Sequence, residues 1–449
     1  MRKSRWLTMV ALVGVLTLVA AACSKDNGGG GGSTGSSGAS GSAIDCDTVQ
    51  FGCVVYGPGE PIRVGTLLAI SGDVATLGVD SVHGVELAID HLDGKFDATP
   101  GQLLGHDVTL QQEDDLCSKE GGQSGATKLA ADPTIAFVIG TSCSSAALGV
   151  ADTILSDKGT ILISPSNTAA GLTAPSQHQP FYLRTAQNDA IQAKVVSDFV
   201  FTKLGFTKAA TIHDESPYAA GLTGGFKTFF EGLGGTVTDE EAITSTDTDF
   251  KPLLTSIAQT HPQLIYLPDF NPACALIAIQ AQDIPDLKGV ALMGSDGCGA
   301  STFFDQAGSA GDGFYLSGPI ASPGSTTSAL SDEYNAAYKD QFGSPTADFN
   351  ANAFDAFNVV TDAIKTVAIQ GSDGSLSIPR VALKDAVFQT VDFAGLSGTL
   401  TCISTGDCQA PGAVNIGVYQ APDAPVNPAT PDAKPIFNEQ LTLAEALGQ

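Results

Sequence analysis

The sequence has few basic residues. Lys and Arg number 21 against 48 Asp and Glu, so the formal net charge of the 449-residue chain is −27 at pH 7. Contacts with nucleic acid or with an anionic membrane surface depend on Lys and Arg, and the composition therefore argues against nucleic acid as a partner. Hydrophobic residues make up 43% of the chain, which excludes global disorder. The length favours two or three lobes over a single domain.

The sequence also lacks the motifs of several enzyme and metal-site classes. It contains no G-x-S-x-G and no C-x-x-C, and its six histidines are scattered. His83 and His91 lie eight residues apart without a nearby cluster of ligands, so we expect no metal site. The acidic runs at 114–115 and 239–241 are more typical of solvated surface than of a general acid–base pair. We therefore expect neither an enzyme nor a cofactor.

The N-terminus has the pattern of an export signal. Three basic residues within the first five are followed by an almost wholly apolar run over residues 6–22. A transmembrane anchor is the alternative, but it requires about 20 apolar residues. The run is shorter and ends in small residues at Cys23, and LVAAAC (18–23) resembles the bacterial lipobox, in which the signal is cut before a cysteine that then carries lipid. We predict a signal peptide over 1–22, lipidation of Cys23, and a location on the outer face of the cytoplasmic membrane.

A Gly/Ser-rich segment follows Cys23. Residues 24–43 have no apolar run and no periodicity, which is typical of a flexible linker. Twenty such residues have an r.m.s. span of roughly 25 Å. We expect residues 23–43 to tether a folded body to the membrane through the lipid on Cys23.

The cysteine count agrees with export. Nine cysteines occur, and eight remain if Cys23 carries lipid; an even number in an exported protein suggests disulfides. Eight cysteines allow 105 pairings. Proximity suggests Cys46–Cys53, within an N-terminal segment of residues 44–61, and Cys402–Cys408. The pairing of the other four is open at this point.

The body of the chain alternates between strand and helix patterns. The run IAFVIG (135–140) is wholly apolar, which is typical of a strand buried on both faces of a parallel sheet. The alternation restarts after residue 184, so the sequence predicts an α/β fold with two halves built from right-handed βαβ units. Helices are predicted over residues 79–92, 121–131, 146–158, 190–204, 219–233, 250–260, 273–282, 328–342, 351–369 and 379–389, and strands over 62–70, 108–112, 135–140, 160–164, 209–213, 263–267, 289–293, 313–317, 398–403 and 415–420.

Polar residues follow several of these strands. In an open parallel sheet, ligands bind beyond the carboxyl ends of the strands. The loops TSCSS (141–145) and PSNT (165–168) offer hydroxyls and backbone N–H groups before predicted helices, a combination that binds carboxylates but also simply caps helices. Asp296, after the strand at 289–293, is placed to hold an ammonium group or to form a turn.

Taken in order, these segments resemble a known family, the type I periplasmic solute-binding proteins of the branched-chain amino acid (Leu/Ile/Val) class, which are the extracytoplasmic receptors of ABC importers. The resemblance extends over residues 62–420. It is carried by IRVGTLLAISG at the start, DDLC (114–117), FVIGTSCSSA followed by ILISPSNT, RTAQND (184–189), IHDESPYAAG (212–221) and LMGSDG (292–297).

The resemblance implies a set of ligand-binding residues and two disulfides. The α-carboxylate is expected at Ser144 and Thr168, with backbone groups of Ser142 and Ser166, and the α-ammonium at Asp296; Tyr218 and Phe270 are expected to close on the ligand, and Leu77 stands where the family often has an aromatic side chain. The family's disulfide between DDxC and the first loop implies Cys117–Cys143, which leaves Cys274–Cys298.

The resemblance also implies an architecture. It places residues 62–184 and 318–397 in lobe 1, residues 185–317 and 398–425 in lobe 2, and a tail at 426–449. We expect three crossings between the lobes, near 184–187, 316–319 and 395–400.

The expected function is capture of a small amino acid between the lobes of a monomeric receptor, followed by delivery to an ABC permease. Asp296 is one methylene shorter than the glutamate usual in the family, and Asp269 stands where many relatives have small residues. Two alternatives stay open: a receptor that senses its ligand without transport, and a relative that binds amides, urea or aromatic acids.

Overall fold

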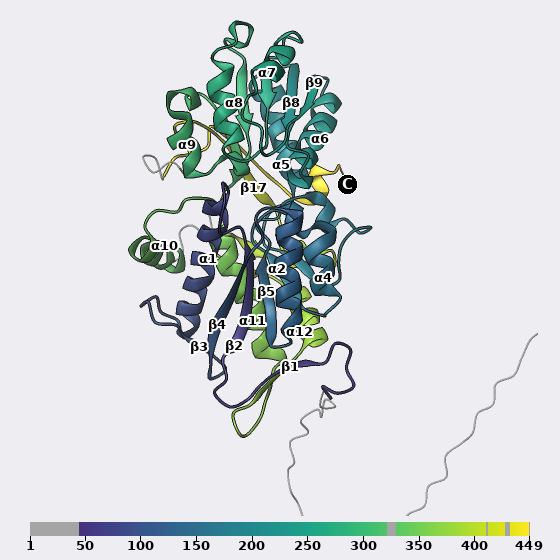
Figure 1. Cartoon of the computed structure of the whole chain (residues 1–449), viewed down its shortest axis with the longest axis vertical. Helices are drawn as coiled ribbons and strands as arrows, with labels where there is room; N and C mark the ends of the chain where they lie inside the picture. Colours follow the sequence, from purple (N-terminus) through teal and green to yellow (C-terminus); the bar gives the residue numbers. More distant parts are fainter. Residues whose placement is uncertain (1–44, 321–328, 410–411, 427–431, 449) are drawn as a thin grey trace, which may run out of the picture. The chain divides into compact units, whose positions relative to one another are not determined.

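The computed structural model describes residues 45–320, 329–409, 412–426 and 432–448 (Figure 1). These residues belong to one compact unit, Ile44–Gln449. The predicted signal peptide, the lipidation site Cys23 and the linker at 24–43 lie outside the described residues. None of the described helices is both long and apolar enough to cross a membrane.

Lobe 1 is built around a six-stranded sheet. Its strands, in spatial order, are β3 (Gln102–Leu103), β4 (His106–Asp114), β2 (Ile62–Leu68), β5 (Ile135–Gly140), β6 (Ile161–Ser164) and β7 (Tyr182–Arg184). All pairs are parallel except β3 with β4. Every residue of β5 is buried, as its apolar run predicts. The helices of this lobe are α1 (Ala75–Asp90), α2 (Lys119–Ala131), α3 (Ser144–Ala146), α4 (Asp152–Ser156), α10 (Ala329–Phe342), α11 (Asn350–Val367) and α12 (Arg380–Phe388).

Lobe 2 has a seven-stranded mixed sheet. Its spatial order is β18 (Phe437–Leu441), β17 (Val414–Gln420), β12 (Tyr315–Pro319), β11 (Ala291–Gly294), β10 (Leu264–Tyr266), β8 (Lys208–His213) and β9 (Thr236–Ala242). The pairs from β9 to β12 are parallel, and β17 and β18 add two antiparallel strands. The helices are α5 (Asp189–Asp198), α6 (Pro217–Gly232), α7 (Lys251–Ala258), α8 (Ala273–Ala281), α9 (Ser301–Ala307) and the short α13 (Leu443–Ala446).

The predicted α/β fold is confirmed, and most predicted elements match with ends shifted by a few residues. One helix differs, because the chain from 146 to 158 is not a continuous helix. Leu148 and Gly149 leave the helical conformation, with Gly149 at φ +69°, so α3 ends after one turn and α4 begins at Asp152. In the two main sheets, β3, β7, β9 and β18 have no counterpart among the predicted strands, and α9 has none among the predicted helices.

The lobe boundaries near the C-terminus differ from expectation. Residues 398–408 were assigned to lobe 2, but Leu400, Cys402 and Cys408 are buried in the core of lobe 1. Buried Arg184 holds them there, because its Nε donates to Asp407 Oδ1 over 2.5 Å. Cys408 therefore belongs to lobe 1, whereas Val414, the first residue of β17, belongs to lobe 2.

Two further boundaries shift. The second crossing follows β12, because this strand pairs with β11 and β17 inside the sheet of lobe 2. The segment expected to be a separate tail supplies β18 and α13, which pack on lobe 2. At the other end, β1 (Cys53–Tyr56) pairs with β14 (Leu376–Pro379) and joins residues 53–56 to lobe 1. The small strands β13 (Ile369–Gln370), β15 (Phe393–Ala394) and β16 (Thr399–Leu400) complete the described sheets.

All four expected disulfides are present. They join Cys46 to Cys53, Cys117 to Cys143, Cys274 to Cys298 and Cys402 to Cys408. The second of these lies at the carboxyl edge of the lobe 1 sheet and the third at that of the lobe 2 sheet.

Candidate functional site

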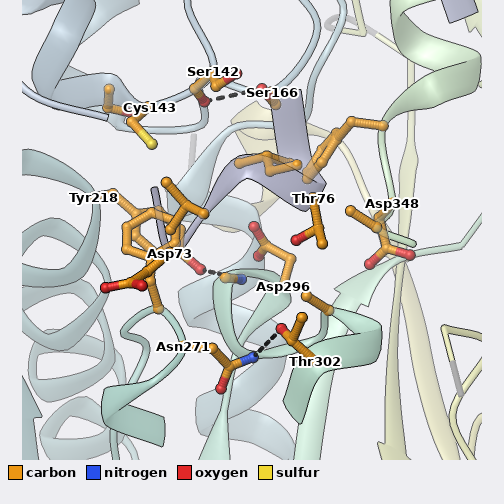
Figure 2. A pocket seen from close by; sticks show the side chains of 18 residues that line it. Asp73, Thr76, Ser142, Cys143, Ser166, Tyr218, Asn271, Asp296, Thr302 and Asp348 are labelled. Atoms are coloured by element: carbon orange, nitrogen blue, oxygen red, sulfur yellow. Dashed lines mark hydrogen bonds between the residues drawn. The ribbon is translucent and has the colours of Figure 1, made fainter. Parts of the chain in front are cut away.

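A pocket lies where loops of both lobes meet (Figure 2). Its cavity volume is about 30 Å³. The lining residues are Asp73, Val74, Thr76, Leu77, Ser142, Cys143, Ser144, Ser166, Tyr218, Phe270, Asn271, Asp296, Gly297, Ala300, Thr302, Ala347, Asp348 and Phe349. The lining comes from both lobes, with Ser142 in lobe 1 and Asp296 in lobe 2.

The lobe 1 side of the pocket is a network of neutral hydroxyl and backbone groups, which we call the hydroxyl wall: Ser142, Ser144 and Ser166. The Ser142 hydroxyl accepts a hydrogen bond from the Ala69 N–H over 2.9 Å, and the Ser166 hydroxyl donates to the Ser142 carbonyl over 2.9 Å. The Ser144 hydroxyl accepts from the Ala169 N–H over 3.2 Å, which leaves its proton to be donated. These contacts tie the two strand-end loops to each other.

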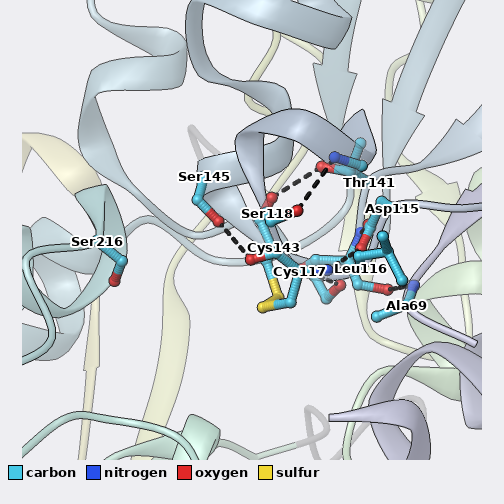
Figure 3. The surroundings of a disulfide bond; sticks show 12 residues. Ala69, Asp115, Leu116, Cys117, Ser118, Thr141, Cys143, Ser145 and Ser216 are labelled. Carbon is cyan, nitrogen blue, oxygen red and sulfur yellow. Dashed lines mark hydrogen bonds between the residues drawn. A yellow bond between two sulfur atoms is a disulfide. The ribbon is translucent and has the colours of Figure 1, made fainter. Parts of the chain in front are cut away.

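A carboxylate and a disulfide hold the first loop in place (Figure 3). Asp115 is fully buried and accepts the N–H groups of Ser142 over 2.6 Å and Cys117 over 2.7 Å. Burial raises the pKa of Asp115 to about 7, although these hydrogen bonds act in the opposite direction. The Cys117–Cys143 disulfide fastens the same two segments, and the Ser145 hydroxyl donates to the Cys117 carbonyl over 3.0 Å. The motif DDLC thus works as a brace for the hydroxyl wall.

The opposite side of the pocket carries Asp296, which follows β11. Its Oδ1 accepts a hydrogen bond from Gln192 Nε2 over 2.7 Å, and Gln192 belongs to α5. Burial raises the pKa of Asp296 to about 6, while the hydrogen bond from Gln192 lowers it. Beside it, the Tyr218 hydroxyl accepts the Gly297 N–H over 3.0 Å, and the rings of Tyr218 and Phe270 lie 5.1 Å apart. Asp296 and the two rings therefore border one space.

A third segment, residues 346–349, brings a second partly buried carboxylate, Asp348. Burial, together with the smaller effects of the nearby Asp296 and Asp80 carboxylates, raises the pKa of Asp348 to about 8. The segment is held by Asp80 of α1, which accepts the Thr346 N–H over 3.0 Å and Asn350 Nδ2 over 2.7 Å. The Ser301 N–H of lobe 2 donates to the Thr346 carbonyl over 3.0 Å, so this segment bridges the lobes at the pocket.

The pocket is acidic. Asp73, Asp296 and Asp348 line it, and no Lys, Arg or His is among the 18 lining residues. The described part of the chain holds no group of three or more His, Cys, Asp or Glu side chains arranged for a metal ion. A pocket with hydroxyl donors on one side and carboxylates on the other suits a ligand with one anionic end and at least one cationic group.

The structure brings seven of the eight predicted ligand residues together: Ser142, Ser144, Ser166, Tyr218, Phe270, Asp296 and Leu77. The eighth, Thr168, is buried behind them, and its hydroxyl has no hydrogen-bond partner. The loop that carries it leads into a single 3₁₀ turn, Ala170–Thr173, so the expected helix start is absent there. Asp269, also singled out, is fully buried with both carboxylate oxygens unpartnered and does not line the pocket.

Sequence reasoning missed Asp348, Thr76, Asn271 and Gln192. Gln192 lies in the first half of a predicted helix, where nothing distinguishes it from a surface residue. Asp348 precedes a predicted helix and has the pattern of a cap. Only the return of the chain to lobe 1 brings it to the pocket.

Comparison with known proteins identifies relatives of this chain. Residues 61–421 match the family described as periplasmic binding protein. A Leu/Ile/Val-binding protein homologue of Brucella melitensis is 27% identical over 370 residues, which cover 81% of this chain and 92% of that protein. A Leu/Ile/Val-binding protein of Rhizobium johnstonii is 28% identical over 347 residues, or 77% of this chain and 88% of the relative.

Solved structures show the same fold. A leucine-binding protein of Thermotoga maritima superposes with a TM-score of 0.69 at 23% identity and covers 80% of this chain and 96% of that one. An ABC transporter solute-binding protein of R. palustris, solved in complex with benzoate, gives a TM-score of 0.67 at 21% identity, with 86% and 96% coverage.

Proposed function

This chain belongs to the type I periplasmic binding protein family, in the branch of the branched-chain amino acid receptors, and from that premise we propose that it is an exported receptor that captures a small amino acid between its lobes and delivers it to an ABC permease. The family consists of solute-binding proteins, not enzymes. The observation that carries the proposal is the opposition of the hydroxyl wall to Asp296 across one pocket.

A zwitterion satisfies both sides of the pocket at once. Its carboxylate accepts hydrogen bonds from the Ser144 hydroxyl and the neighbouring backbone groups. Its ammonium donates to the Asp296 carboxylate, which Gln192 orients. These groups come from different lobes, so the ligand binds the closed form better than the open form. That difference in affinity is the free energy that closes the lobes.

An aromatic acid is the second candidate, because solved neighbours of the same fold hold benzoate and 4-hydroxybenzoate. Such a ligand has a carboxylate for the hydroxyl wall but no cation for Asp296. Binding it would leave the desolvated Asp296 carboxylate without a cation, which is unfavourable. The charges of the pocket therefore favour the amino acid.

Asp296→Asn tests the proposal. Loss of the charge should weaken amino acid binding by about 10- to 100-fold, since a hydrogen bond to a charged group contributes about 1.5–3 kcal/mol. The measurement is titration calorimetry of the purified protein with the 20 amino acids, amides, urea and aromatic acids. Asp305→Asn is the control, because Asp305 is an exposed residue of α9 with the same charge. Tight binding of benzoate and no binding of any amino acid would refute the proposal.

We further propose that the receptor is a monomer anchored by lipid at Cys23. The LVAAAC segment and the linker behind it support this, as does the family's place outside the cytoplasm. Cys23→Ser should move the protein from the membrane fraction to the soluble fraction of cells and abolish its labelling with a fatty acid. Unchanged membrane association of this variant would contradict the lipid anchor.

A further inference from the structure

The charges that line the pocket do not balance with a neutral amino acid. The ligand's carboxylate takes the hydroxyl wall and its ammonium takes Asp296. Asp348 then remains, partly buried in the same pocket, with no positively charged residue among the lining side chains. Ionising a desolvated carboxyl without a partner is costly, so Asp348 keeps its proton beside a neutral side chain, whereas a ligand that supplies a second cation pairs with the ionised form.

Asp348 is not engaged in holding the fold. No described residue donates a hydrogen bond to its carboxylate. Two other aspartates of the same lobe show the contrast. Asp80 accepts hydrogen bonds from Tyr338, Thr346 and Asn350, and Asp355 accepts them from Leu396 and Ser397. Those two side chains fasten segments of lobe 1 together, whereas the acceptor capacity of Asp348 faces the pocket.

Asp348 and Asp296 border the same space. A Cβ placed on Gly318 of β12 would lie 3.6 Å from Asp348 Oδ2 and 3.7 Å from Asp296 Cβ. In the view of Figure 2, Thr76 lies between the two carboxylates. A single small ligand can therefore reach both. The position of Asp348 is also fixed, since Asp80 and Ser301 bind the backbone of Thr346 from opposite lobes.

We propose that Asp348 is a second cation-binding residue of the pocket and that the amino acid captured here carries a positively charged side chain. The inference rests on the proposed function and narrows its substrate class. It assigns the α-ammonium to Asp296 and the side-chain cation to Asp348. Without a cation beside it, the Asp348 carboxyl has a pKa raised to about 8. Binding of the cation therefore ionises Asp348 and releases a proton near neutral pH.

The test compares ligands that differ in side-chain charge. Titration calorimetry of the purified protein is run with 2,4-diaminobutyrate, ornithine, lysine and arginine against leucine, norleucine and glutamine. The basic amino acids should bind at least about tenfold more tightly than the neutral ones. Repeating the titration in buffers of different ionisation enthalpy should show greater proton release with the basic ligands than with the neutral ones.

Variants at position 348 then locate the effect. Asp348→Asn should weaken the basic ligands by about 10- to 100-fold and leave the neutral ones within about threefold. Asp348→Leu should shift the preference to aliphatic amino acids. Asp340→Asn, an exposed residue of α10, is the control for the change in net charge. A thermal unfolding scan of each variant verifies that it is folded.

The outcomes separate this inference from the proposed function. Tight binding of leucine or another neutral amino acid, with weak binding of the basic ones, would overturn the inference and leave the receptor function standing. Equal losses in Asp348→Asn and Asp340→Asn would overturn the role of Asp348, because the preference would then come from net charge. Binding of aromatic acids or amides in place of every amino acid would overturn both proposals.

Discussion

The two sides of the pocket are built on opposite principles. The hydroxyl wall is neutral, and most of its polar groups are already bonded to one another, to Asp115 and to the backbone of Ala69 and Ala169. Across from it, Asp296 has a hydrogen bond from Gln192, and Asp348 has none from a described residue. The first side is held by its own hydrogen bonds, and the second carries the two acidic side chains. The contrast teaches that the shape of the pocket comes mainly from the hydroxyl wall, and that its charge comes from Asp296 of lobe 2 and Asp348 of lobe 1.

Removal of the Cys117–Cys143 disulfide, which braces the hydroxyl wall, is the test of this comparison with the largest expected effect. Cys117→Ser with Cys143→Ser opens a loop closed over a separation of 26 residues, which should lower the free energy of unfolding by about 3 kcal/mol. It should also weaken ligand binding, since the disulfide braces the hydroxyl wall. Denaturant unfolding and calorimetry measure the two effects.

The matched control is Cys46→Ser with Cys53→Ser. That disulfide closes a separation of seven residues at the end of lobe 1 that carries β1, and neither cysteine lines the pocket. Its removal should lower stability and leave affinity unchanged. Equal loss of affinity in both double variants would show that the hydroxyl wall needs no local brace.

The pH dependence of stability gives a smaller and more selective test. Burial raises the pKa of Asp115 to about 7, above the value near 3.9 of an exposed aspartate. The folded state therefore holds this proton more tightly than the unfolded state does. The resulting stability is present in full below about pH 4 and is lost as the pH rises through 7. Between pH 5 and pH 8 the loss should be roughly 2–3 kcal/mol.

Asp115→Asn isolates this contribution, because other carboxyls with raised pKa values, among them Asp296, Asp348 and Asp355, stay in place. Urea unfolding at pH 5, 6, 7 and 8 should show a shallower decline for the variant than for the native protein. Parallel declines would mean that Asp115 keeps its charge in the folded state.

The sequence predicted the parts of the fold that depend on local pattern. The apolar run of β5 and the helical spacing of α1 needed only neighbouring residues. β9 and β18 were missed because they lie at the edges of the sheet and carry charged and polar residues, TVTDEEA and FNEQL. Residues 398–408 were placed in the wrong lobe because the partner that holds them, Arg184, lies more than 200 positions earlier.

The difference between local pattern and contacts distant in sequence also explains which pocket residues were predicted. Loops that directly follow strands of a parallel sheet were predicted, since their position follows from the strand itself. Asp348 was not, because it follows no strand and reaches the pocket only through the hydrogen bonds of Asp80 to its neighbours. Thr168 has the expected type and position in the loop, and its buried hydroxyl has no hydrogen-bond partner among the described residues.

The strand β18 has a consequence for anyone who trims or tags this protein. It covers the outer edge of β17 over the whole register from Val414–Leu441 to Val418–Phe437, and Phe437 and Leu441 pack on a small apolar cluster with Ile191 and Ile416. A truncation at residue 426, which the Pro-rich composition of the following residues invites, would uncover the hydrogen-bonding edge of a buried strand. Uncovered edges of this kind recruit other chains. Expression vectors should keep the sequence through Ala446 and separate any C-terminal affinity tag from it with a spacer.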